Sequence, residues 1–314
     1  MKQHHFILPL ILGTLALGTQ ALSQPIKDAA QGQAIVTVLP AHGDAEAAPV
    51  AMKDLQLKIN GKPASATAWT ALRGPEAPIE IVVLIDSSVR SDFGSQLGDV
   101  ADFVKEAPSH AKIAIAVMQN GQAILATPLS ADPQVAVRGV RLPIGSVGSS
   151  ASPYFCLSDL AKHWPSTDQN ARRIVVMITN GIDNYAPRYD PEDTYVQTAI
   201  QDSVRARLLV YSIYWQDRGG PASSSFAADG GLSLLQQVAD ATGGKSYSLG
   251  TGEPVSLAPY FTDLRVQLRS QYRLNFSAPL ESKSRLLSLH VKTSTPGVKT
   301  QAPEQVLVAQ PAGL

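Results

Sequence analysis

Oxygen-bearing side chains follow directly on a strongly apolar segment. The segment Ile79–Ile85 is almost wholly apolar and rich in Val and Ile, which predicts a parallel strand covered on both faces. Asp86 comes next, and the hydroxyls of Ser87, Ser88 and Ser91 follow it. Open α/β sheets bind ligands at the carboxyl ends of their strands, so this turn is the first candidate site. Its carboxylate and hydroxyl oxygens suit a hard cation such as Mg²⁺.

A second polar turn follows a second apolar segment. Arg172–Thr179 reads RRIVVMIT and predicts another buried strand, which is followed by the polar stretch Asn180–Tyr189. The Gly- and Ser-rich stretch Ser146–Ser152 and the later stretch Gln216–Asp229 are also predicted loops. We expect these loops and the Asp86 turn to gather at the carboxyl edge of one sheet.

The elements between residues 79 and 270 alternate between strand and helix patterns. The predicted strands are Ile79–Ile85, Lys112–Met118, Gln122–Pro128, Arg172–Thr179, Leu208–Tyr214 and Lys245–Ser248. The predicted helices are Phe93–Glu106, Asp132–Val140, Pro153–Trp164, Asp190–Arg207, Leu232–Thr242 and Pro254–Ser270. This alternation predicts an α/β fold with a doubly wound, mostly parallel sheet. The short Asn120-Gly121 link makes the third strand antiparallel.

Residues 34–74 and 271–309 carry β patterns and flank the α/β segment. Leu55–Ile59 alternates with period two, and Asn60-Gly61 predicts a hairpin turn after it. Neither flank holds enough strands to be stable alone, so we expect the two to pair as one β-rich appendage.

The first 23 residues have the pattern of a signal peptide. An apolar run, Phe6–Gly18, follows a polar start, and Ala21-Leu22-Ser23 supplies small residues for cleavage before Gln24. The run is shorter than the roughly 20 residues that a membrane span requires. We expect an exported protein, periplasmic or secreted, with no membrane span after cleavage and a flexible lead over residues 24–33.

Composition and motifs argue against several classes of function. The chain has 26 basic and 26 acidic residues, whereas a nucleic-acid partner calls for a basic face. Cys156 is the only cysteine and is expected to be a buried, inert thiol. The sequence contains no HExxH zinc motif, no GxSxG nucleophile elbow and no phosphate-binding GxxxxGK[ST] loop. We therefore expect a protein that is not an enzyme.

The strand ends resemble a known family. Leu84-Ile-Asp86-Ser-Ser-Val-Arg90, followed by Ile178-Thr-Asn-Gly-Ile-Asp-Asn184, resembles the von Willebrand factor type A (VWA) domain. The segments Ile59-Asn-Gly-Lys-Pro63 and Leu268-Arg-Ser-Gln-Tyr-Arg-Leu-Asn-Phe276 are similar to motifs of the secreted VWA-related proteins of acidobacteria. The resemblance covers about residues 50–309 and implies a Rossmann-like fold.

The family's metal-ion-dependent adhesion site binds Mg²⁺ through a D-x-S-x-S turn, a Thr from a second loop and an Asp that ends a later strand. Residue by residue, the resemblance places Asp86 and Ser88 on the first two positions, but Arg90 on the third. The Thr position falls in Ser149–Ser152, where Ser150 or Ser152 could substitute. The later Asp is Asn180 here.

These departures imply a degenerate metal site. Asn180 lacks the charge of a carboxylate, and Arg90 adds a positive charge near Asp86. Two unit charges about 4 Å apart near a protein surface interact by roughly 4 kcal/mol, which favours an Arg90–Asp86 pair over a cation. Asp183, three residues beyond Asn180, could compensate, so weak Mg²⁺ binding stays open. Asp86 and Ser88 could also simply cap the following helix.

The sequence thus predicts an exported VWA-like module that recognises an unknown protein or surface. We expect recognition to use direct contacts from Arg90, Asn184, Tyr185 and Trp215. Trp215 lies just past a strand end, where it could be exposed beside its loop or buried. The alternatives are a Mg²⁺-dependent adhesin with a compensated site, a structural envelope component, and a hydrolase whose residues assemble only in space. An Asp183/Asp190/Asp193 calcium site does not fit EF-hand spacing, and helix capping better explains Asp190 and Asp193.

Overall fold

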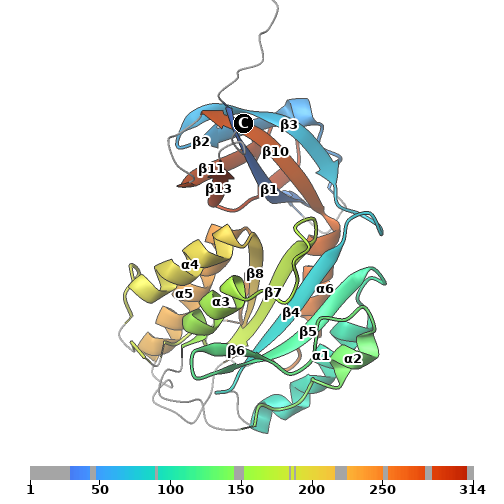
Figure 1. Ribbon diagram of the computed structural model, residues 1–314, viewed down its shortest axis with the longest axis vertical. Helices are drawn as coiled ribbons and strands as arrows, with labels where there is room; N and C mark the ends of the chain where they lie inside the picture. Colours follow the sequence, from blue (N-terminus) through green and yellow to red (C-terminus); the bar gives the residue numbers. More distant parts are fainter. Residues whose placement is uncertain are drawn as a thin grey trace, which may run out of the picture.

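The computed structural model describes residues 29–42, 47–88, 91–144, 152–183, 185–186, 189–215, 225–249, 254–279 and 285–309. These residues form an α/β domain and a separate β-rich unit at one end of it (Figure 1). Arg90, Ser150, Asn184 and the predicted signal peptide lie outside the described residues.

The sheet of the α/β domain has the strand order β6-β5-β4-β7-β8-β9. Its strands are β4 (Ile79–Asp86), β5 (Ala111–Gln119), β6 (Gln122–Leu125), β7 (Arg172–Thr179), β8 (Leu208–Tyr214) and β9 (Ser246–Tyr247). All neighbours pair in parallel except β5 and β6, as the short Asn120-Gly121 link predicts. Every residue of β4, β7 and β8 is buried, which explains why their sequences are mostly apolar.

Helices cover both faces of this sheet. One face packs against α1 (Leu97–Lys105), α2 (Pro133–Val137) and α6 (Ala258–Arg269). The other face packs against α3 (Pro153–Lys162), α4 (Thr194–Arg205) and α5 (Ser225–Thr242). Because a helix that follows a parallel strand returns antiparallel to it, the N-termini of α1, α4, α5 and α6 lie at the carboxyl edge of the sheet. Helix α3 begins at the same edge, since the Tyr154 hydroxyl donates to Gly181 O.

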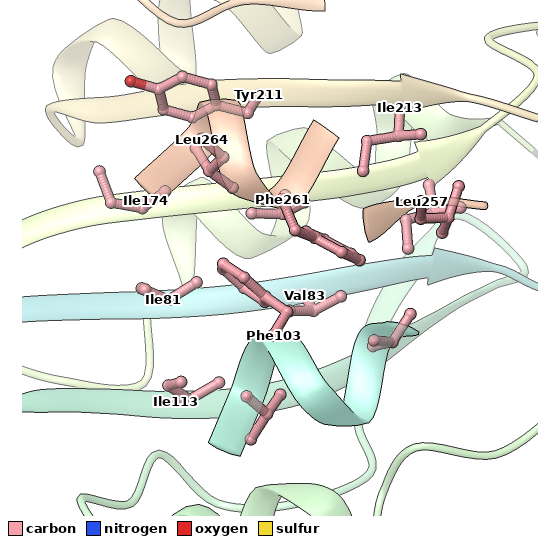
Figure 2. Close-up of a cluster of buried hydrophobic side chains, with 14 of the residues drawn as sticks. Ile81, Val83, Phe103, Ile113, Ile174, Tyr211, Ile213, Leu257, Phe261 and Leu264 are labelled. Atoms are coloured by element: carbon pink, nitrogen blue, oxygen red, sulfur yellow. The ribbon is translucent and has the colours of Figure 1, made fainter. Parts of the chain in front are cut away.

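The core of the first face centres on two stacked aromatic rings. Phe103 of α1 and Phe261 of α6 lie 4.5 Å apart between ring centroids, and their planes differ by 15°. Figure 2 shows both rings above Ile81 and Val83 of β4. This contact fixes α1 and α6 against the strand that ends at Asp86.

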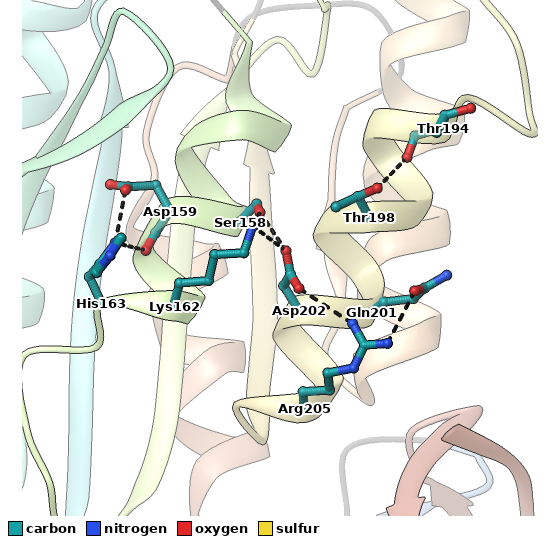
Figure 3. Close-up of polar contacts among 9 residues, drawn as sticks. All are labelled: Ser158, Asp159, Lys162, His163, Thr194, Thr198, Gln201, Asp202 and Arg205. Atoms are coloured by element: carbon teal, nitrogen blue, oxygen red, sulfur yellow. Dashed lines mark hydrogen bonds and ion pairs between the residues drawn. The ribbon is translucent and has the colours of Figure 1, made fainter. Parts of the chain in front are cut away.

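A largely buried carboxylate joins α3 to α4 on the other face (Figure 3). Asp202 Oδ2 accepts a hydrogen bond from Ser158 Oγ at 2.6 Å and pairs with Lys162 Nζ at 3.0 Å. Its Oδ1 lies 3.5 Å from Arg205 Nη1. These contacts hold the two helices in register, and so they position both helix N-termini at the carboxyl edge of the sheet.

The β-rich unit is built from both flanking segments. Its strands are β1 (Ala29–Pro40), β2 (Leu55–Ile59), β3 (Lys62–Ala71), β10 (Gln271–Pro279), β11 (Arg285–Thr293), β12 (Val298–Gln301) and β13 (Gln305–Ala309). The order β10-β3-β2-β11-β13-β1 closes on itself because β1 also pairs with β10, and β12 adds to β1. Short 3₁₀ turns at Met52–Asp54 and Ser91–Gln96 precede β2 and α1.

Several predicted boundaries are wrong for tertiary reasons. Residues 29–33 are not a flexible lead, because Ala29–Gln33 pair with Asn275–Pro279 in the ladder between β1 and β10. The predicted edge strand to Pro128 ends at Leu125. The predicted capping role is confirmed for Asp193, which accepts from the N–H groups of Tyr195 and Val196, but α4 begins at Thr194 and not at Asp190.

Helix α5 begins at Ser225, inside the stretch predicted as a loop to Asp229. Its glycines lower the helix propensity of the sequence, but the packing requires them. A Cβ on Gly231 would lie 2.3 Å from Asn180 O, and one on Gly181, at φ +68°, would lie 2.6 Å from Gly231 O. The helix therefore approaches the turn after β7 as closely as backbone allows.

The ring stack between α1 and α6 gives a test of this architecture. Replacing Phe261 with Ala should lower the free energy of unfolding by about 3–5 kcal/mol, because it removes a buried ring and leaves a cavity. Val266→Ala, on the exposed side of the same helix, should change it by less than about 0.5 kcal/mol. Urea unfolding followed by circular dichroism measures both, and equal losses would contradict the assigned packing.

Candidate functional site

The carboxyl ends of β4 and β7 are tied together by one carboxylate. Asp86 Oδ2 accepts a hydrogen bond from Thr179 Oγ1 at 2.6 Å, and Asp86 Oδ1 accepts one from the Ser88 N–H at 2.8 Å. Thr179 Oγ1 in turn accepts the Gly181 N–H at 3.1 Å. We call this set of Asp86, Ser88, Thr179 and Gly181 the Asp86 corner. The predicted meeting of Asp86, Ser88 and the turn at Asn180 is therefore present.

Burial dominates the electrostatics of this corner. Asp86 is only 8% exposed, and its burial raises the pKa of the carboxyl above the ordinary 3.8. The hydrogen bonds from Thr179 and Ser88 lower that pKa without cancelling the effect of burial. Burial also raises the pKa of the Cys156 thiol to about 12, so this cysteine is protonated at neutral pH.

Asn180 lies at the position where the resemblance calls for an Asp. Its side chain is hydrogen-bonded to the backbone of the turn that follows it. The residue is buried, and its Oδ1 accepts the Ile182 N–H at 2.9 Å. Mg²⁺ requires near-octahedral oxygen ligands, usually including carboxylates. No group of three or more His, Cys, Asp or Glu residues in the described part of the chain could hold a metal. With both oxygens of Asp86 already hydrogen-bonded, the described donors fit a tightly held Mg²⁺ poorly.

Two other predicted contact residues occupy different environments. Ser152 is buried and caps α3, since its Oγ accepts the Phe155 N–H at 3.4 Å. Trp215 is only 4% exposed and packs edge-to-face on Phe93 with ring centroids 5.1 Å apart. The prediction that Trp215 makes direct contacts with a partner is therefore wrong, because its position directly after β8 places the ring in the core.

Asp183 keeps one oxygen without a hydrogen-bond partner. Its Oδ1 accepts the N–H groups of Tyr185 at 2.8 Å and Ala186 at 3.3 Å. Its Oδ2 is buried and accepts no hydrogen bond from the described residues. Burial raises the pKa of this carboxyl, and the hydrogen bonds from the N–H groups of Tyr185 and Ala186 lower it.

Three aromatic side chains contact one another at the same edge of the sheet. The rings of Phe155, Tyr185 and Tyr195 lie 4.8–5.5 Å apart between centroids, and we call these three the rim aromatic patch. Tyr185 is 51% exposed. Beside the patch lies an open cleft with about 370 Å³ of empty space, including the part open to solvent, and its lining includes Asp183, Tyr189, Asp193 and Phe226. We call it the rim cleft; its Phe226 is 69% exposed.

Part of this surface is not among the residues predicted from the sequence. The pattern of Arg172–Thr179 predicts Thr179 only as a strand end, although a hydroxyl at the end of a central strand is a recognisable signal. Phe155 and Tyr195 lie in the first turns of α3 and α4, and Phe226 in the first turn of α5. Aromatic residues in the first turns of three helices that meet at one edge could have been read from the sequence. Their contact with Tyr185 could not.

Comparison with known proteins gives structural likeness only. No family model and no curated protein matches the sequence. A von Willebrand factor type A protein from Catenulispora acidiphila is 13% identical, with a TM-score of 0.47, 91% of this chain covered and 74% of that one. An aerotolerance-related membrane protein from Bacteroides fragilis is also 13% identical, with a TM-score of 0.41, 60% of this chain covered and 98% of that one.

A third similar structure is the ArnB paralog VWA2 from Sulfolobus acidocaldarius. It is 10% identical, with a TM-score of 0.39, 88% of this chain covered and 76% of that one. Two of these three structures carry the name of the family that the sequence resembles. The narrower resemblance to secreted acidobacterial proteins stays a prediction. None of the helices in the described part of the chain is long and apolar enough to cross a membrane.

The buried carboxyl of Asp86 predicts a pH dependence. Its pKa is raised above 3.8 in the native state, so the native state holds this proton more tightly than the unfolded state. The free energy of unfolding of the wild type, minus that of Asp86→Asn, should therefore fall as pH rises from about 4 through the raised pKa. Above that pKa the difference should level off.

Urea unfolding of the wild type and of Asp86→Asn at a series of pH values measures this difference in the free energy of unfolding. The contributions of the other titrating groups are common to both proteins and cancel in the difference. A difference that grows with rising pH would mean that the corner favours the charged carboxylate, and would contradict the account.

Proposed function

We propose that this chain is an exported, non-enzymatic binding module that recognises a protein partner through the carboxyl edge of its α/β sheet. The observation that carries the proposal is the cluster of exposed aromatic rings at that edge. Tyr185, Tyr195 and Phe226 are all exposed, although large aromatic side chains are usually buried in a soluble protein. Such rings offer a large contact area at low entropy cost and dominate many protein interfaces.

The aromatic and acidic lining of the rim cleft indicates which side chains of a partner it would bind. Tyr189 and Phe226, with ring centroids 6.4 Å apart, form an aromatic wall. Asp183 and Asp193 supply carboxylates, one of which has an oxygen without a hydrogen bond in the described part of the chain. Aromatic faces and carboxylates together attract Lys and Arg side chains. We therefore propose that the partner presents a basic side chain to the rim cleft and apolar groups to the rim aromatic patch.

We propose that this recognition proceeds without a tightly bound metal. The supporting observation is that the carboxylate of the Asp86 corner accepts its hydrogen bonds from Thr179 and Ser88. The corner then acts as the scaffold that holds the loop after β7 in place, while the neighbouring aromatic and acidic side chains make the contacts. Magnesium-dependent adhesion would require these hydrogen bonds to be replaced by metal ligands.

A capture experiment tests the proposal. The purified chain, immobilised, is exposed to envelope extract of the producing organism, and bound proteins are quantified by mass spectrometry. We expect a specific partner that the Tyr185→Ala/Phe226→Ala variant recovers at least about tenfold less well, because each ring is a central contact. The partner, once purified, should show the same loss of affinity by calorimetry.

The matched control is Ile124→Ala/Leu125→Ala, which also removes two exposed apolar side chains, but from the edge strand β6. It should recover the partner like the wild type. Equal recovery by the rim variant and the control variant would count against the rim as the binding surface.

A further inference from the structure

A cleft far from the rim lies where the α/β domain meets the β-rich unit. The empty space at this cleft is about 630 Å³, a figure that includes the part open to solvent. Residues at the starts of β7 and β8 line one side, and residues of β1, β10 and β13 line the other. We call it the junction cleft; its polar lining includes Gln33, Asn170, Arg172, Arg207, Arg273 and Gln305.

The lining of the junction cleft is basic. Three of its residues are arginines, and none of the described residues that line it is Asp or Glu. Arginine side chains that leave water are normally paired with a carboxylate or another anion. The junction cleft therefore carries the positive charge of three guanidinium groups. No acidic side chain among its described lining residues compensates that charge.

Arg172 is the most deeply placed of the three. It is only 5% exposed, and its Nη1 donates to Leu268 O at 2.9 Å and to Gln271 Oε1 at 2.7 Å. Its Nε is buried and donates to no described residue. Burial lowers the pKa of Arg172 to about 10, and the positive charge of Arg273 contributes to this shift. The side chain is still charged at neutral pH.

The other two arginines also have only neutral partners in the hydrogen bonds found. Arg273 Nη2 donates to Asn170 O at 2.7 Å, while its buried Nε has no acceptor among the described residues. Arg207 Nη1 makes a long hydrogen bond of 3.4 Å to Gln33 Oε1. Carbonyl and amide oxygens thus hold the guanidinium groups without neutralising them.

We infer that the junction cleft binds a small, multiply charged oxyanion: a phosphate group or a polycarboxylate. Guanidinium groups bind the oxygens of both anions through paired N–H donors. An anion here would relieve the repulsion between Arg172 and Arg273 and would contact side chains from both parts of the molecule. This site is separate from the rim and does not depend on the proposed protein partner.

Titration calorimetry with inorganic phosphate, and separately with citrate, tests the inference at constant ionic strength. We expect at least one of them to bind with a Kd below about 1 mM, as a ligand held by several charged hydrogen bonds should. Binding of phosphate but not citrate assigns the site to phosphate groups, and the reverse assigns it to polycarboxylates.

Arg207→Gln and Arg273→Gln should each weaken the binding at least about tenfold, since each removes a charged donor. Arg141→Gln, an equal change of charge at an exposed position outside the cleft, should bind like the wild type. Circular dichroism establishes that each variant is folded. The inference is overturned if neither anion binds to the wild type, or if folded Arg207→Gln and Arg273→Gln both bind as the wild type does.

Discussion

One hydrogen bond, from the Thr179 hydroxyl to the Asp86 carboxylate, organises the carboxyl edge of the sheet. It joins the ends of the two central strands, and Thr179 also accepts the Gly181 N–H that starts the following turn. Because both groups are buried, the loss of either partner would leave an unsatisfied polar atom, which costs more than an ordinary hydrogen bond contributes. The geometry of the loop after β7 depends on this bond.

The helices that carry the rim aromatic patch and the rim cleft pack closely around that loop. Tyr154 of α3 donates to Gly181 O at 2.7 Å, and the glycines of α5 let that helix approach Asn180 and Gly181 from the other side. The Asp202 network fixes α4 beside α3, so that Phe155 and Tyr195 meet Tyr185. The exposed aromatic surface therefore results from the packing of α3, α4 and α5 around the turn after β7.

The sequence predicted the parts of this arrangement that depend on local pattern. The apolar runs of β4, β7 and β8 have almost the boundaries expected of them, because strands buried on both faces leave an unmistakable composition. The gathering of Asp86, Ser88 and the Asn180 turn also follows from strand topology. By contrast, the burial of Trp215 and the early start of α5 arise from contacts between distant segments, which no local pattern encodes. The position of the Thr179 hydroxyl at a strand end can be read from the sequence, but its hydrogen bond to the distant Asp86 cannot.

The central claim is that Thr179 and Ser88, rather than a metal ion, satisfy the Asp86 carboxylate. Calorimetric titration of the purified chain with Mg²⁺, after removal of metals with EDTA, tests this most directly. The account predicts no binding in the micromolar range. Micromolar binding that disappears in Asp86→Ala would contradict it, since the carboxylate would then be a metal ligand in place of a scaffold.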